Sequence, residues 1–253
     1  QQMFGAVMKT YFAKKIGVAP EDMVTVSIMP CVAKKGERNM ELFYEEYAGH
    51  DVDVVLTTRE LTRMIRMAHI DPGTLVDVPC DDPMADGTGA GVIFGTTGGV
   101  MEAALRSAYY LITGENPDAD AFREVRSTRE QPKWKEAEFH INDIAIKTAV
   151  VNGLANTREL IGAVERGEVH YDFVEVMACP GGCVGGGGQP IRDGCELATE
   201  RSRNLRTLDE TAPVRFSHEN KAVQRLYDEF MEKPLSHKAH MLLHTDHMAW
   251  EMP

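Results

Sequence analysis

The sequence predicts an α/β fold, in which short strands alternate with amphipathic helices. Two runs rich in β-branched residues, "VTVSIMP" (24–30) and "DVDVVLTT" (51–58), are each followed by residues with the apolar spacing of a helix. A third run, "YDFVEVMAC" (171–179), leads directly into a glycine-rich stretch. With 253 residues, 43% of them hydrophobic and 26% charged, the chain can bury a sizeable core.

Helices are predicted from apolar periodicity and from capping residues. The chain opens on a helical pattern, whose apolar side would consist of Met3, Phe4, Val7, Tyr11 and Phe12. Thr57 and Glu60 have the spacing of a capping box. The helix that follows is expected to bury Leu61, Met64, Ile65 and Ala68.

Later elements follow the same signals. A helix is expected to begin after Gly99 and to stop at Gly114, because glycine commonly terminates a helix. Strands are predicted at "AEFHIN" (137–142) and "IKTAVVN" (146–152), followed by a helix opened by Asn156 with Glu159. The last helix would run from Ser217 with an apolar face of Val223, Leu226, Tyr227 and Phe230.

Composition excludes several classes of function. The 27 Lys and Arg against 39 Asp and Glu give a net charge of −12, which repels nucleic acids and anionic membranes. No apolar run approaches the roughly 20 residues of a membrane span, and we expect a cytoplasmic protein. The first residues contain no initiator methionine at position 1 and already have a helical pattern, so we expect a fragment of a longer chain.

The five cysteines are too few and too odd in number for a disulfide scaffold, which leaves metal binding or burial. Cys31 and Cys179 each follow a predicted strand and stand two residues after a methionine, and Cys183 follows in the glycine-rich stretch. Strand ends in α/β sheets are where ligand crevices form. Three thiolates among glycines suit an inorganic cluster better than a single ion. Cys80 and Cys195 have no partner motif and are interpreted as structural.

Three other interpretations are weaker. The stretch "VMACPGGCVGGGGQP" (176–190) does not end in the Gly-Lys-Ser/Thr of a phosphate-binding loop. "GTGAGVIFG" (87–95) lacks both the GxGxxG order and a preceding strand, which argues against a dinucleotide site. A zinc or nickel site is conceivable from the helical spacing of four histidines, although no carboxylate or thiol accompanies them: His237, His240, His244 and His247.

Two of these segments resemble the second and third cysteine signatures of [FeFe]-hydrogenases: "IMPCVAKKGE" (28–37) and "VMACPGGCVGGGGQP". The segments "TTRELTRMI", "GAGVIFGTTGGVMEAALRSAYYL" and "KPLSHKAHMLLH" are similar to the same family, so the resemblance covers essentially the whole chain. It implies two α/β lobes, each a small, mostly parallel sheet flanked by helices, with the metal cluster between them. Residues 1–98 would form the first lobe and residues 99–253 the second, which would lack strands from an upstream segment.

The resemblance also implies a cofactor, the H-cluster. This is a [4Fe-4S] cluster joined to a diiron subsite that carries CO, cyanide and a bridging dithiolate. Cys31 and Cys179 would ligate the [4Fe-4S] cluster, and Cys183 would ligate it and bridge to the diiron subsite. Lys34 would donate a hydrogen bond to a cyanide nitrogen.

Four further residues would surround the diiron subsite on the same grounds. Met29 and Met177 would flank it with polarizable sulfur, Phe94 would pack nearby, and Gln1 would line the pocket. The family's first signature, Thr-Ser-Cys-Cys-Pro, supplies the fourth cluster ligand and is absent from this sequence. We therefore expect residues 1–253 alone to be inactive.

The implied activity is the reversible reduction of protons to H2. The implied partners are a ferredoxin-like electron carrier, or fused or associated Fe–S or NAD(P)-linked subunits, together with hydrogenase maturation factors. Two non-catalytic alternatives stay open, an H2 sensor and an iron–sulfur assembly factor, as does a fragment that only conducts electrons. Against an assembly factor stand Met29, Lys34 and the intact "GGCVGGGGQP".

Overall fold

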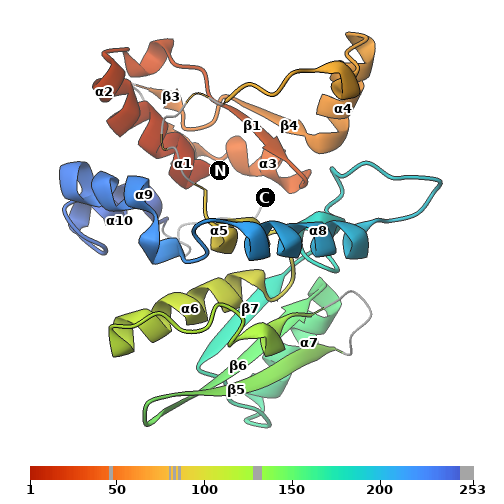
Figure 1. Cartoon of the computed structure of the whole chain (residues 1–253), viewed down its shortest axis with the longest axis vertical. Coiled ribbons are helices and arrows are strands. Elements are labelled where there is room, and N and C mark those ends of the chain that lie inside the picture. The colour runs from red at the N-terminus through yellow and green to blue at the C-terminus, as the bar shows by residue number, and fades with distance from the viewer. Residues whose placement is uncertain (46–47, 80, 82–83, 85–86, 128–132, 246–253) are drawn as a thin grey trace. The chain divides into compact units, whose positions relative to one another are not determined.

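The structure is a computed structural model of the chain (Figure 1), and it describes residues 1–45, 48–79, 81, 84, 87–127 and 133–245. The chain divides into two compact units, and each is described by itself. Unit 1 comprises residues 1–85 and 221–253, and unit 2 comprises residues 86–220. The predicted α/β class is confirmed, because small sheets flanked by helices make up both units. Cys80 and His247 lie outside the described residues.

Unit 1 is built on the parallel strands β1 (Val26–Met29) and β4 (Val54–Thr57). Their register pairs Met29 with Thr57, so the two strands end side by side. The other elements of the unit are α1 (Gln2–Val7), the π-helical η1 (Met8–Phe12), α2 (Ala13–Ile16), η2 (Pro20–Asp22), α3 (Ala33–Arg38), η3 (Glu41–Phe43), the antiparallel pair β2 (Tyr44–Glu45) and β3 (Gly49–His50), α4 (Thr58–Met67), η4 (Pro72–Thr74), α9 (Lys221–Leu226), the π-helical η8 (Tyr227–Met231) and α10 (His237–Leu243).

The capping box at the start of α4 is confirmed. The Thr57 hydroxyl accepts a hydrogen bond from the Glu60 amide at 3.1 Å, and the Glu60 carboxylate accepts one from the Thr57 amide at 2.8 Å. The expected burial of the apolar side of α4 is wrong, because no residue of this helix is buried and Met64 is 52% exposed. The helix is amphipathic, but the described residues cover its apolar stripe only in part: Leu61 and Ile65 are half-buried, and Met64 is exposed.

The amino-terminal helix differs from its prediction in a similar way. Val7 is buried in a small core together with Leu226 and Met231 of the returning chain. Met3 and Phe4, expected on the same buried side, are 57% and 51% exposed. The π-helical segment η1 begins after Val7, so it shifts only Tyr11 and Phe12 off the regular spacing of 3.6 residues per turn.

Unit 2 contains a three-stranded sheet in the order β5 (Trp134–Ile141), β6 (Ile144–Asn152) and β7 (Phe173–Met177). The first two strands form an antiparallel hairpin, and β7 joins in parallel to β6. The hairpin turns at Asn142, whose φ of 53° is one that asparagine tolerates well. The other elements are α5 (Gly89–Ile93), α6 (Gly99–Thr113), η5 (Arg123–Val125), α7 (Leu154–Glu165), η6 (Cys183–Gly185), α8 (Ala198–Thr211) and η7 (Ser217–Glu219).

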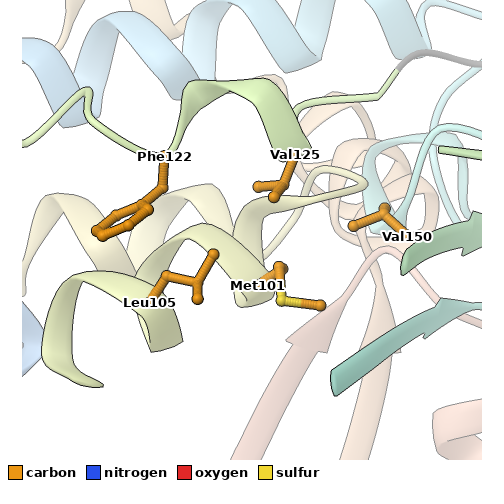
Figure 2. Packing of buried hydrophobic residues seen from close by; sticks show 5 residues of the cluster. All are labelled: Met101, Leu105, Phe122, Val125 and Val150. Atoms are coloured by element: carbon orange, nitrogen blue, oxygen red, sulfur yellow. The ribbon is translucent and has the colours of Figure 1, made fainter. Parts of the chain in front are cut away.

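The second half of the central strand β6, residues 148–151, is buried on both faces because a helix covers each of them. On one face Val150 packs with Met101 and Leu105 of α6 and with Phe122 and Val125, all at most 4% exposed (Figure 2). On the other face Ala149 and Val151 pack against Leu160 of α7. Each of the buried Val, Leu, Phe and Met side chains contributes about 1.5–3 kcal/mol, so the two helices stabilise the sheet from whose edge the loops extend.

Helix ends in unit 2 test the capping predictions. Helix α6 ends before Gly114, which has a φ of 79°, as predicted. Helix α7 begins earlier than predicted, after Gly153, and the Asn156 side chain instead donates to the Asn152 carbonyl at 2.9 Å. The stretch considered for a dinucleotide site forms α5, capped by Thr88. Within the described residues, no helix is long and apolar enough to cross a membrane.

Candidate metal-cluster site

Cys179 and Cys183 lie on one loop of unit 2, which leaves the carboxyl end of β7. Within the loop, the Gly182 amide donates to the Cys179 carbonyl at 3.0 Å, and the Gly186 amide donates to the Cys183 carbonyl at 2.9 Å. These bonds fold the backbone tightly around both cysteines. Both side chains are half-buried, so the thiols are accessible without being on an open surface.

The cysteine loop is held against the segment that follows α5. The Val184 amide donates to the Gly95 carbonyl at 2.9 Å, and the Thr97 amide donates to the Gly181 carbonyl at 3.2 Å. A Cβ on Gly182 would lie 2.7 Å from the Thr97 nitrogen, and its φ is +92°. Only glycine fits there, because any side chain would collide with backbone and strain φ. Bare backbone is therefore what lets this loop pack against its neighbour.

Phe94 and Met177, two predicted pocket residues, belong to the same unit. Phe94 ends α5 directly before Gly95, which bonds to the cysteine loop, and it is 45% exposed. Met177 ends β7, opposite Asn152 of β6, and is half-buried. The structure thus brings the Phe94 segment to the loop from a position about ninety residues earlier in the chain.

Glu175 in the middle of β7 is a residue that sequence reasoning missed. It is 5% exposed, and its carboxylate accepts hydrogen bonds from the Gly98 amide at 2.6 Å and the Met101 amide at 2.7 Å. Burial raises the pKa of Glu175, although these backbone amides oppose the shift. The amides belong to the first turn of α6, which has no side-chain cap of its own. Its position could have been noticed in the sequence, because Glu175 is a charged residue at an inward-facing position of a predicted strand.

Helix α8 supports the cysteine loop from a further side. The Arg201 guanidinium donates to the Val184 carbonyl at 3.2 Å and also to the Pro190 carbonyl. Gly95, next to the loop, approaches α8 so closely that a Cβ there would lie 2.7 Å from Leu205 Cδ1. The loop is therefore fixed by β7 at its start and by α8 at its end.

A buried charge network joins α8 to α6. Arg106 is 0% exposed, and its guanidinium donates to both Asp209 oxygens, at 2.9 and 2.8 Å, and to Glu102 at 2.8 Å. Burial by itself would raise the pKa of Asp209, but hydrogen bonds from Arg106 and Arg215 outweigh it and hold that pKa below its usual value. This network anchors the helix on which the cysteine loop rests.

The same network contains a candidate cation site. The carboxylates of Glu102, Asp120 and Asp209 lie within 4.8 Å of one another. Arginine guanidinium groups already bond all three, including Arg126 to Glu102 and Arg215 to Asp120. The arginines supply the positive charge, so we interpret the group as a structural network.

Unit 1 carries the other predicted residues. Cys31 is half-buried between β1 and α3, two residues past Met29. Lys34 lies in the first turn of α3, where its ammonium contacts the Glu37 carboxylate. The Gln1 side chain donates to the Lys34 carbonyl at 3.0 Å and accepts from the Ser27 hydroxyl at 3.0 Å. The structure therefore brings Gln1 and Lys34 together and ties them to β1.

Cys31 belongs to unit 1 and Cys179 and Cys183 to unit 2, so the meeting of the three thiols stays a prediction. Their chemistry fits the cluster, because thiolates are the usual ligands of iron–sulfur clusters, and the glycine amides around Cys183 suit cluster sulfurs. Cys195 is exposed.

The histidine alternative finds little support in α10. His240 and His244 stack with their ring centroids 5.0 Å apart. No group of three or more candidate metal ligands among the described residues includes a histidine.

Comparisons with known proteins agree on one family. Residues 1–187 match the family model "Iron only hydrogenase large subunit, C-terminal domain", and residues 195–250 match "Iron hydrogenase small subunit". We call residues 195–250 the small-subunit region. A subunit of the NADP-reducing hydrogenase of Solidesulfovibrio fructosivorans, HndD, is 46% identical over 97% of this chain and 41% of its own length. The chain thus spans less than half of that relative.

Two further comparisons bear on function. The solved HydA1 [FeFe]-hydrogenase of Chlamydomonas reinhardtii, in a variant form, aligns with a TM-score of 0.79 and 40% identity over 97% of this chain and 68% of that one. Cytosolic iron-sulfur assembly component 3 of Mus musculus is 31% identical over 100% of this chain and 53% of its own length. Sequence and fold together show that the chain belongs to the [FeFe]-hydrogenase family and corresponds to the C-terminal domain of its large chain, followed by a small-subunit region.

Proposed function

We propose that this chain is the H-cluster-binding part of a catalytic [FeFe]-hydrogenase, which reduces protons reversibly to H2. Cys31, Cys179 and Cys183 would hold the [4Fe-4S] cluster, with Cys183 also bridging to the diiron subsite. Lys34 would bond a cyanide ligand, because an ammonium is a strong donor to an anionic acceptor. The bound H-cluster supplies the redox chemistry, in which two protons and two electrons give H2.

The protein's own residues bind, orient and enclose that cofactor. Met29 and Met177 would present polarizable thioethers to it, and Phe94 would exclude water. Gln1 would hold the α3 backbone at Lys34 through its 3.0 Å bond to the carbonyl, so that the ammonium keeps its position.

The observation that carries the proposal is the packing of the cysteine loop. Cys179 and Cys183 stand on a backbone fixed to Gly95 and Thr97, with glycine at positions 182 and 185, where a side chain would collide with backbone. A rigid, half-buried pair of thiols on a strand end suits a permanently bound cluster. The strained backbone of this loop costs free energy, which would have no evident purpose if the two cysteines bound nothing.

The alternative is an iron–sulfur assembly factor, which the mouse relative supports. That relative is 31% identical, whereas the relatives named hydrogenases are 40–46% identical. Lys34 favours the hydrogenase, because its proposed partner is a cyanide of the diiron subsite. A cluster without that subsite has no such ligand.

The test uses the full-length protein from its natural gene, produced with hydrogenase maturation factors. We expect iron, CO and cyanide infrared bands, and H2 evolution with a strong reductant. Cys183→Ser should abolish both the bands and the activity, because a serine oxygen is a poor bridge between soft iron centres. Cys195→Ser, at an exposed cysteine, is the matched control. Iron without CO and cyanide bands in the parent protein would favour the assembly factor.

Lys34→Ala separates the two metal parts of the site. We expect iron close to that of a [4Fe-4S] cluster but weak CO and cyanide bands, since the change removes a donor and leaves every thiolate. Lys35→Ala is the control, because Lys35 pairs with Glu60 of α4 at 2.7 Å. CO and cyanide bands of equal strength in Lys34→Ala and Lys35→Ala would show that Lys34 does not bind the diiron subsite.

Electron partners follow from the same proposal. A ferredoxin-like carrier or an associated Fe–S subunit would deliver electrons, and the name of the Solidesulfovibrio relative points to an NADP-linked assembly.

A further inference from the structure

Unit 1 contains a cavity of about 250 Å³ that none of the three candidate cluster-ligating cysteines lines. Residues of α1 and η1, of α3, and of the chain around α10 line it. Polar side chains reach it from several of these elements, among them Gln2, Thr10, Lys34, Glu37 and His244.

The side chain of Gln2 is the unusual feature of this cavity. Gln2 is 7% exposed, and neither its amide nitrogen nor its amide oxygen has a hydrogen-bond partner in the part of the chain that the structure describes. An amide buried without partners is costly, and such groups are normally satisfied by protein or by ordered water. Its position is fixed, because Gly5 on the same helix packs so closely that a Cβ would lie 2.3 Å from the Asp51 carbonyl oxygen.

The charges of the lining narrow the choice of ligand. Lys9 and Lys34 disfavour a cation, while Glu37 and Asp51 disfavour an anion. Lys9 bonds the Asp53 carboxylate at 3.0 Å, which further limits its attraction for an anion. An apolar ligand would leave the Gln2 amide unsatisfied. Water both donates and accepts, and a cavity needs only roughly 10–15 Å³ to hold one molecule.

The lining of the cavity extends from the Lys34–Glu37 pair to a residue at the solvent-exposed surface. At one side the cavity is lined by Glu37, whose carboxylate contacts the Lys34 ammonium and lies 3.5 Å from the Gln1 amide nitrogen. At another it is lined by His244, which is exposed to solvent. Water between these residues would link bulk solvent to the Lys34–Glu37 pair.

We propose that this cavity holds a cluster of ordered waters, positioned by Gln2, that carries protons from solvent to Glu37. The proton-carrying role rests on the proposed hydrogenase function, whereas the water site does not. Each water accepts one proton from its neighbour and passes one on, so no water is consumed. The Glu37 carboxylate receives the proton and returns it to Lys34, which it contacts and which would have given a proton to the bound cofactor, so Glu37 is ready to accept again. Gln2 is a positioning residue, because it acts on the proton only through the waters.

The first test is a crystal structure of the full-length protein at a resolution that shows ordered water. We expect waters within hydrogen-bond distance of both Gln2 amide atoms, and fewer waters in Gln2→Met, which keeps the length of the side chain and removes its polar atoms. A dry cavity, or one filled by protein side chains, would overturn the proposal.

The second test is the solvent deuterium isotope effect on H2 evolution. Gln2→Met should slow H2 evolution several-fold and enlarge the isotope effect, and Glu37→Gln, which keeps the shape but cannot accept the proton, should do the same. Gln224→Met, at an exposed glutamine of α9, should change neither. Waters present with an unchanged isotope effect in both variants would overturn the proton route. A parent protein that makes no H2 would refute the proposed function and the route with it, while the crystal structure would still decide the water site.

Discussion

Replacement of Arg106 with methionine would test how strongly the buried charge network stabilises unit 2. The guanidinium of Arg106 is fully buried and bonds Glu102 and both oxygens of Asp209, at 2.8–2.9 Å. Methionine fills much of the same volume with no donor. Two buried carboxylates would then lose a partner without gaining access to water.

The expected cost follows from the partners that remain. Removing one member of a buried ion pair destabilises a protein by about 3–5 kcal/mol. Asp209 keeps Arg215 at 2.7 Å and Glu102 keeps Arg126 at 2.7 Å, so neither carboxylate is left alone. We therefore expect the lower end, about 3 kcal/mol, which in a domain of this size lowers Tm by roughly 6–12 °C.

The measurement is urea unfolding of the full-length protein followed by circular dichroism. Arg166→Met is the matched control, because Arg166 makes a similar bond to Glu168, at 2.6 Å, on the exposed surface, and such pairs contribute little. A loss of unfolding free energy for Arg106→Met no larger than for the control would refute the reasoning.

The pH dependence of the unfolding free energy gives a second check. Because the pKa of Asp209 is lowered in the native state, its stabilising contribution is complete above the unfolded value of 3.8 and disappears as pH falls through the native value.

Three further changes probe the surroundings of the cysteine loop. Gly182→Ala should destabilise the protein by about 1–3 kcal/mol and lower its iron content, because the new Cβ meets the Thr97 nitrogen at 2.7 Å; unchanged iron by colorimetric assay would contradict this. Glu175→Ala should cost about 2–4 kcal/mol in urea unfolding, since two backbone amides of α6 lose their buried acceptor. His218 accepts a hydrogen bond from, or donates one to, Ser107 at 3.0 Å, and burial lowers its pKa. Its contribution to stability is thus complete above the unfolded value of 6.5 and falls below it, so the difference in unfolding free energy between parent and His218→Gln should shrink from pH 7.5 to 5.5.

The sequence was sufficient to predict features that depend on neighbouring residues. The capping box at Thr57 and Glu60 and the end of α6 at Gly114 were predicted correctly, because each is set by backbone geometry within a few positions. The cysteine loop was also located at a strand end, since β7 stops at Met177. Features that depend on residues a few positions apart can thus be predicted without knowledge of the fold.

Contacts between distant segments could not be predicted in the same way. Glu175 bonds an amide 77 residues away, and Arg106 bonds a carboxylate 103 residues away. A strand pattern shows that Glu175 points inward, but not that its carboxylate accepts hydrogen bonds from the first turn of a helix. The predicted burial of the apolar side of α4 was wrong for a different reason. Periodicity indicates a face suited to burial, but it does not say how much of that face other segments cover.

The small-subunit region shows how the family's two modules depend on each other physically. Within unit 2 its helix α8 provides Asp209, which is 1% exposed and bonds Arg106 and Arg215. Within unit 1 the same region provides α9 and α10, which enclose Val7 of α1 in a common apolar core. Separation of the small-subunit region would remove the bidentate partner of Arg106 and would expose that core. Because Arg201 of α8 also bonds the Val184 carbonyl of the cysteine loop at 3.2 Å, this region must stay attached, whether fused or held as a separate chain, for the loop to keep its support.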